Sequence, residues 1–187
     1  MIVTAVAKST TARSIQPGVG VDVEQATRWL RQACRGVARV HDAGLLHKDI
    51  KPENLFISND QDVLVGDLGI ACLRDATGAG HFGGTAETMA PEVAVVGATM
   101  SPAAWPNQRP TTVLSDVYSL GASLYWLLAG IPPFHVPGDN IATMRAVVAG
   151  PQLVSGMLPR MSRRRWPNVS SARWTAQQRP GISHPRT

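Results

Sequence analysis

Apolar residues recur every three or four positions after Asp22, which is the spacing of one face of an α-helix. Asp22 and Gln25 have the spacing of a capping box, in which the first side chain caps the helix and the second reaches back to it. Gly44 is suited to end the helix. The pattern therefore predicts a helix between Asp22 and Gly44. Its buried face should consist of Val23, Ala26, Leu30, Ala33, Cys34 and Val37.

Short apolar runs elsewhere in the first half predict β-strands. Residues 2–6 (IVTAV) are rich in β-branched residues and precede a polar stretch that ends in the turn sequence QPGVG. Residues 55–57 (LFI) and 63–65 (VLV) are separated by the polar sequence SNDQD. We expect these two runs to pair as a small hairpin.

The second half alternates irregular segments with helices. Residues 70–90 are rich in Gly, Ala and Thr and have no period, so we expect a long loop, and such a loop inside a domain is usually functional. Residues 98–112 predict a second irregular connector. An apolar helix should then begin at Ser115 or Asp116 and end at Gly130.

The most apolar stretch of the chain, residues 117–131, is too short and too interrupted for a membrane span. Serines and glycines break it, and about 18 or more apolar residues are needed to cross a bilayer. We therefore expect a buried helix and no membrane span. Residues 140–149 predict one further short helix.

The charge of the chain is concentrated at one end. The 187 residues are enough for one domain with its own core, and their formal charge of +5 by itself favours a nucleic-acid or membrane surface. Residues 1–139, however, carry ten Lys and Arg against thirteen Asp and Glu, a net of −3. Residues 140–187 carry eight Arg and no acid. We therefore do not expect nucleic acid as a partner of the folded part.

The tail at residues 158–187 consists mainly of Arg, Ser, Pro and Trp and has almost no aliphatic period. Such a composition can bury little apolar area to offset the entropy of ordering. We expect the tail to be disordered and solvated.

The two cysteines, Cys34 and Cys72, do not form a CxxC pair. Their spacing argues against a zinc site or a disulfide framework and favours reduced thiols, as in a cytoplasmic protein. The first residues lack the basic and apolar regions of a secretory signal. We expect a cytoplasmic location.

Residues that carry chemistry are concentrated in the middle of the chain. HKDIKPEN at residues 47–54 is followed by DLG at 67–69, GT at 84–85, APE at 90–92 and SDVYSLG at 115–121. These motifs, in this order and at this spacing, resemble the Ser/Thr protein kinase family. The sequence of the last motif and of the residues that follow it is most similar to bacterial members of the family. The resemblance covers about residues 22–135.

The resemblance implies four residues for phosphoryl transfer from ATP to a Ser or Thr hydroxyl of a protein substrate. This reaction requires in-line positioning of a hydroxyl and neutralisation of charge on the phosphate oxygens. Asp49 would accept or orient the hydroxyl proton, and Lys51 would lie near the transferred phosphate of the nucleotide. Asn54 and Asp67 would supply oxygen ligands to Mg²⁺.

Four other residues are implied to support this site. His47 would pack inside the large lobe, and Asp116 would brace the backbone of residues 47–54. Thr85, in the activation segment, would contact the catalytic Asp and Lys. Glu92 would pair with an arginine far downstream. Arg179 is the candidate for that partner, with a solvated tail arginine as the alternative reading.

Three departures from the family pattern leave the reacting groups in place. Lys48 replaces the usual Arg, so a bidentate group becomes a point charge. Leu68 replaces Phe, and Thr88 stands where many relatives have Tyr.

The sequence contains no G-x-G-x-x-G before residue 47, and Lys8, the only preceding Lys, has no V-A-I-K context. The resemblance therefore implies an α+β, mainly α fold: the helical large lobe of a kinase, without the glycine-rich loop and β3 Lys of the small lobe. We expect a remnant of hinge and connector at 1–21, the kinase-like large lobe at 22–157 and the tail at 158–187.

Two functions are compatible with these features. The first is a Ser/Thr protein kinase-type phosphotransferase in a truncated form with little intrinsic activity, and a partner chain is one possible source of the missing lobe. The alternative is a non-catalytic, kinase-like binding or scaffold module.

Overall fold

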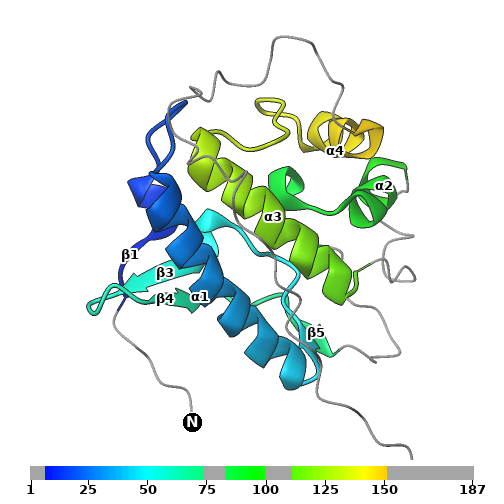
Figure 1. Ribbon diagram of the computed structural model, residues 1–187. Coiled ribbons are helices and arrows are strands. Elements are labelled where there is room, and N and C mark those ends of the chain that lie inside the picture. The colour runs from blue at the N-terminus through cyan, green and yellow to red at the C-terminus, as the bar shows by residue number, and fades with distance from the viewer. Residues whose placement is uncertain (1–6, 74–82, 100–110, 151–187) are drawn as a thin grey trace, which may run out of the picture. The chain divides into compact units, whose positions relative to one another are not determined.

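Two long antiparallel helices organise the part of the chain that the computed structural model describes, residues 7–73, 83–99 and 111–150 (Figure 1). The helices are α1 (Val23–Asp42) and α3 (Val113–Ala129). All described residues belong to the unit Met1–Val154. The strand predicted at residues 2–6 and the tail predicted at 158–187 lie outside the described residues.

Helix α1 begins and ends where the sequence predicts. The Asp22 carboxylate accepts hydrogen bonds from the backbone N–H groups of Glu24 and Gln25. The Gln25 side chain, in contrast, accepts from Arg28 and does not reach back to the cap. Gly44, with φ of 74°, follows the last turn.

The buried face of α1 differs from the predicted one at Trp29 and Cys34, and the predicted Val23 and Leu30 are only half-buried. Ala26, Ala33 and Val37 are buried as expected, but Trp29 is buried as well and Cys34 is exposed. At about 100° per residue, Cys34 lies ~80° around the helix from Ala26, on the flank of the apolar stripe. The large Trp29 ring fills the core on the other flank.

A three-stranded antiparallel sheet has the order β1-β3-β4. The predicted hairpin is confirmed as the pair β3–β4. The first strand, which pairs with β3, was not predicted because three of its four side chains are polar and give no apolar run. A further pair, β2 with β5, brings part of the predicted loop at 70–90 into a sheet. The strands are β1 (Ala7–Thr10), β2 (Leu45–Leu46), β3 (Leu55–Ser58), β4 (Val63–Val65) and β5 (Cys72–Leu73).

A tight turn at residues 16–20 packs against the C-terminal end of α3. The N–H of Val21 donates to the carbonyl of Leu127, at 2.7 Å. Gly130 ends α3 with φ of 76°, and a Cβ at this position would lie 2.3 Å from the carbonyl oxygen of Gln16. Only glycine therefore allows this approach of two backbones.

Helix α3 begins earlier than predicted. Its N-cap is Thr112, whose hydroxyl accepts from the N–H of Leu114, while the Ser115 hydroxyl accepts from the N–H of Thr112. The expected start at Ser115 or Asp116 is therefore wrong, because Ser115 is the third helical residue of a capping box. The end at Gly130 is confirmed.

A second hydrophobic cluster joins α2 (Pro91–Thr99), α4 (Asn140–Ala149) and the short 3-10 helix η3 (Ala86–Thr88). Helix α4 was predicted, whereas α2 was not and extends into the expected connector at 98–112. Two other 3-10 helices, η1 (Thr11–Ser14) and η2 (Pro52–Asn54), lie in the first half. Among the described residues, no helix is both long and apolar enough to cross a membrane.

Candidate active site

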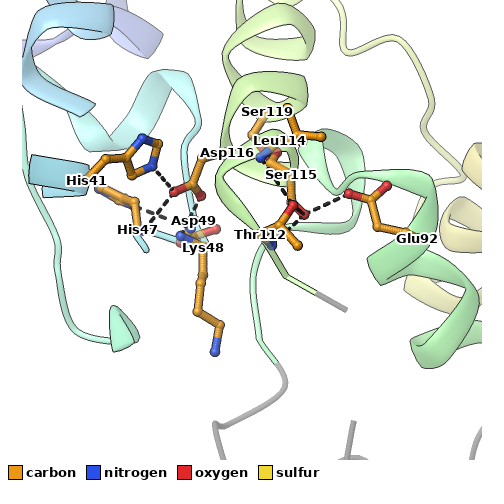
Figure 2. Close-up of polar contacts among 10 residues, drawn as sticks. All are labelled: His41, His47, Lys48, Asp49, Glu92, Thr112, Leu114, Ser115, Asp116 and Ser119. Atoms are coloured by element: carbon orange, nitrogen blue, oxygen red, sulfur yellow. Dashed lines mark hydrogen bonds and ion pairs between the residues drawn. The ribbon is translucent and has the colours of Figure 1, made fainter. Parts of the chain in front are cut away.

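The loop that carries HKDIKPEN, residues 47–54, connects β2 to β3 and is held by one carboxylate from α3. Asp116 Oδ2 accepts from the backbone N–H of His47 and Asp116 Oδ1 from the backbone N–H of Lys48, both at 2.9 Å. Asp116 is only 1% exposed. A buried carboxylate with two backbone donors fixes the direction in which the loop leaves β2 (Figure 2).

A residue that the sequence interpretation missed completes this contact. His41, in the last turn of α1, places its Nε2 atom 2.8 Å from Asp116 Oδ2. Because an ionised carboxylate only accepts hydrogen bonds, Nε2 carries the proton in this contact. Asp116 therefore ties α1, α3 and the 47–54 loop together. His41 and Asp116 are 75 residues apart, so no local pattern in the sequence predicts their contact.

The backbone at Lys48 has a left-handed conformation, with φ of 73°. Such a conformation costs a non-glycine residue on the order of 1–3 kcal/mol. The two N–H bonds to Asp116 offset this cost. The Lys48 side chain points away from Asp116, and Arg, the usual residue here, is replaced by a point charge.

Gly84 packs directly onto this strained backbone. Its φ is 120°, and a Cβ at Gly84 would lie 2.7 Å from the carbonyl oxygen of Lys48. The close approach brings the following residue, Thr85, next to the 47–54 loop. The GT motif, Gly84 and Thr85, is therefore the place where the activation segment contacts the 47–54 loop.

Three polar side chains meet at this contact. Lys51 Nζ donates to Thr85 Oγ1 at 2.7 Å and lies 2.9 Å from Asp49 Oδ2. Thr85 Oγ1 in turn donates to Asp49 Oδ1 at 2.7 Å. The hydroxyl thus accepts from the ammonium and donates to the carboxylate, which holds both charged groups in a defined orientation.

Asn54 holds Asp49 from the opposite end of the loop. Its amide nitrogen donates to the Asp49 carbonyl at 2.8 Å and to Asp49 Oδ2 at 3.0 Å. The buried His47 ring contacts the carbonyl of Gly66 at 3.1 Å, and the N–H of Gly66 donates to the carbonyl of Asn54. These bonds place Asp67, the next residue, at the side of the same loop.

The first 3-10 helix, η1, contacts the 47–54 loop at Pro52. Thr11 is fully buried, and its hydroxyl donates to the carbonyl of Pro52 at 2.8 Å. Pro52 lies between Lys51 and Asn54. The sequence interpretation assigned Thr11 no role, because a lone threonine in a polar stretch carries no signal.

Asn54 and Asp67 have a donor set that fits Mg²⁺. Asn54 uses its amide nitrogen for Asp49, so that its side-chain oxygen has no donor among the described residues. Asp67 is exposed, with φ of 60°, and within the described residues its carboxylate accepts only a long bond, from the N–H of Gly69 at 3.4 Å. Two oxygen ligands suit a cation that keeps several waters and binds phosphate oxygens. Within the described ranges, His, Cys, Asp and Glu form no cluster of three that would hold a metal alone.

Glu92 contacts α3 rather than any arginine of the described residues. Its Oε1 atom accepts from the Ser115 hydroxyl at 2.7 Å. Burial raises the pKa of the Tyr118 hydroxyl, and the Glu92 carboxylate raises this pKa further. Arg179, the expected partner of Glu92, lies outside the described residues.

The other two positions that depart from the family pattern, Leu68 and Thr88, differ in how far their side chains are exposed. Leu68 is 47% exposed, so its replacement of Phe leaves an apolar side chain without a full packing partner among the described residues. Thr88 is buried, and its carbonyl accepts from Ser119 on α3.

Comparisons with known proteins agree with the motifs. The serine/threonine-protein kinase PknL of Mycobacterium tuberculosis is 40% identical over 114 residues, 59% of this chain and 25% of PknL. The probable serine/threonine-protein kinase PknB of Corynebacterium glutamicum is 35% identical over 125 residues, 64% of this chain and 17% of that protein. Calcium/calmodulin-dependent protein kinase type 1 of Caenorhabditis elegans is 33% identical over 119 residues, 62% of this chain and 31% of that kinase.

The chain therefore spans less than a third of the length of each of these relatives. A family model described as protein kinase domain matches residues 1–177, nearly the whole chain. The three relatives are protein kinases, and the two bacterial ones are named serine/threonine-protein kinases. The residues that meet at the site lie within the family match. The chain belongs to the protein kinase domain family.

Proposed function

We propose that this chain provides the phosphoryl-transfer site of a Ser/Thr protein kinase, which moves the γ-phosphate of ATP to a Ser or Thr hydroxyl of a protein. The observation that supports this proposal is the meeting of Asp49, Lys51 and Thr85 within hydrogen-bond distance, with Asn54 bonded to Asp49. A carboxylate, an ammonium and an amide in one loop are the groups this transfer requires.

Asp49 accepts the proton of the substrate hydroxyl as the hydroxyl oxygen forms its bond to phosphorus. The bond from that phosphorus to the oxygen of ADP breaks in the same displacement. Lys51 places positive charge beside the reacting atoms, where negative charge is spread over the phosphate oxygens. Asn54 and Asp67 would hold Mg²⁺, which neutralises phosphate charge when it is bound.

Asp49 is well oriented for this role, because donors reach both oxygens of its carboxylate. These donors come from the loop itself and from the segment around Thr85. The carboxylate therefore cannot rotate without loss of a hydrogen bond, and such preorganisation favours transfer.

The nucleotide-binding half of the site is the second part of the proposal. The 187 residues contain no glycine-rich loop and no Lys in a β3 context. We infer that efficient transfer requires a lobe with these elements, and that these 187 residues alone transfer phosphate slowly, in the cytoplasm.

Radiolabelled ATP and Mg²⁺ with a Ser/Thr-rich protein acceptor test the proposal, with and without a separately expressed nucleotide-binding lobe of a Ser/Thr kinase. We expect incorporation in the presence of the lobe, and a loss of about 100-fold or more for Asp49→Asn. Asp60→Asn is the matched control, because Asp60 is exposed in the turn between β3 and β4. Equal incorporation by wild type and Asp49→Asn, or none in either arm, contradicts the proposal.

The alternative, a non-catalytic binding module, has one observation in its favour. Leu68 beside Asp67 is exposed, which leaves an apolar side chain next to the site available to a partner. The two functions differ in the effect of Asp49→Asn: a scaffold keeps its binding with this variant, whereas a phosphotransferase loses its activity.

A further inference from the structure

The outer face of α1 carries four arginines in a row. Arg28, Arg31, Arg35 and Arg39 follow one another at intervals of three, four and four residues, and all four are exposed. At about 100° and 1.5 Å per residue, they lie within an arc of ~80° and extend over about 16 Å. We call these four residues the α1 arginine row.

Among the described residues, no ion pair involves these four charges. Arg28 donates to the neutral Gln25 side chain, which leaves its charge uncompensated. Like charges three or four residues apart on a helix cost a few tenths of a kcal/mol per pair. The exposed carboxylates of Glu24 and Asp42 lie on the same helix face, four residues before Arg28 and three after Arg39. Arg39 in the last turn is also favourably placed for the helix dipole. Within the row itself, the like-charge cost is offset by no ion pair among the described residues.

The row contrasts with the rest of the folded part. Residues 1–139 contain ten Lys and Arg against thirteen Asp and Glu, and the row supplies four of those ten. Four of the ten positive charges thus lie on one helix face, between the carboxylates of Glu24 and Asp42, while the remainder of residues 1–139 is acidic. A local strip of this kind attracts a compact negative group more strongly than the net charge indicates.

We propose that the α1 arginine row is a docking surface for an acidic peptide segment of a partner protein. Guanidinium groups bind carboxylates in a planar, bidentate geometry. In an extended peptide, acidic residues at alternate positions project from one side at intervals of about 6.7 Å. Arginines four residues apart on a helix are separated by about 6 Å along the axis. The two spacings match closely enough for flexible side chains to pair.

A peptide fits these observations better than nucleic acid does. The row is short, and a long polyanion that extended past it would meet the exposed carboxylates of Glu24 and Asp42 at its two ends. The one aromatic residue of α1, Trp29, is buried, so that this face offers no ring on which bases stack.

A peptide also fits better than a membrane surface. A helix that lies in a membrane interface places an apolar face among the lipids. The apolar face of α1 is already buried in the protein core, with Ala26, Ala33 and Val37. The exposed face carries charged and small side chains and no large apolar one.

The test uses the full chain and a fluorescent peptide of alternating Glu and Ser, with anisotropy as the readout. In the variant Arg31→Gln, Arg35→Gln, Arg39→Gln, we expect affinity to fall by about tenfold or more, which corresponds to about 1.4 kcal/mol. The matched control makes the same three changes in the tail, at Arg163, Arg164 and Arg165, and should change affinity less than about twofold. Glutamine is a good helix former, so the circular dichroism spectrum should stay unchanged, and the unfolding midpoint should stay the same or rise slightly as the like-charge cost is removed.

Three results overturn the proposal. The first is no saturable binding of the peptide to the wild-type chain, or equal binding of a Gln–Ser peptide. The second is an equal loss in both triple variants, which shows a generic attraction, or a larger loss in the tail variant. The third is tighter, row-dependent binding of single-stranded DNA or of phosphatidylserine vesicles than of the peptide. None of these readouts depends on phosphotransfer.

Discussion

The carboxylate of Asp116 on α3 and the imidazole of His41 at the end of α1 lie 2.8 Å apart. The same carboxylate accepts two backbone hydrogen bonds from the 47–54 loop. The packing of the two long helices is therefore transmitted through one buried group to the loop that carries Asp49. Any change in that group should affect both the stability of the fold and the geometry of the site.

Asp116→Asn should destabilise the protein although it preserves the size of the side chain. Three donors face the two carboxylate oxygens, and an amide offers only one oxygen. At least one buried backbone N–H loses its acceptor, at a cost of about 1–3 kcal/mol. Urea unfolding measures this loss.

His41→Leu should cost less than Asp116→Asn, because both backbone donors keep their acceptor. In a double-mutant cycle the two changes should couple, since they share one contact. Additive losses would show that the contact between His41 and Asp116 contributes nothing to stability.

Gly84→Ala should destabilise the protein by about 1–3 kcal/mol. The added Cβ meets the Lys48 carbonyl at 2.7 Å, and the backbone φ of 120° disfavours any other residue. Gly121→Ala is the matched control, because Gly121 lies within α3 with nothing within 4 Å of its Cβ position. This control should gain about 0.5–1 kcal/mol from helix propensity. An equal response of both variants in chemical denaturation contradicts the close packing at Gly84.

Thr85→Val should reduce phosphotransfer by about tenfold in the assay with the added lobe, for a net loss of about 1.4 kcal/mol. The hydroxyl accepts from Lys51 and donates to Asp49, and valine has the same shape without either bond. Thr85→Ser keeps the hydroxyl and should retain most of the activity. If Thr85→Ser loses as much as Thr85→Val, the methyl group matters and the hydroxyl does not.

Alkaline pH should destabilise the fold through Tyr118. Burial, with the Glu92 carboxylate in addition, raises the pKa of Tyr118 above its ordinary value near 10. The folded state therefore retains the proton that the unfolded chain releases. The resulting stability is present below about pH 10 and is lost as the pH rises through the folded-state pKa.

Glu92→Gln should lower the pKa of Tyr118, since it removes one of the two causes. Absorbance titration of tyrosinate in a Tyr125→Phe background measures this pKa directly, because the chain has two tyrosines. An unchanged Tyr118 pKa in Glu92→Gln would mean that burial alone raises it.

Local patterns predicted the elements whose signals lie close together in the sequence. The helix after Asp22, the hairpin of β3 and β4 and the end of α3 at Gly130 are all confirmed. Each depends on interactions within a few residues, such as a cap, a turn or an apolar period. Helix α2 was missed because its short apolar run has no polar face to give a period.

The sequence by itself determined which chemical groups are present and in what order, since HKDIKPEN, DLG, GT and APE are read without coordinates. Only the tertiary structure decided which groups meet. The contact of Thr85 with Asp49 spans 36 residues, that of Thr11 with Pro52 spans 41, and that of His41 with Asp116 spans 75. The tertiary structure also decided that Trp29 is buried while Cys34 and the α1 arginine row face outward. The physical reason is that helix periods and caps arise from neighbouring residues, whereas burial and long-range hydrogen bonds depend on how distant segments pack.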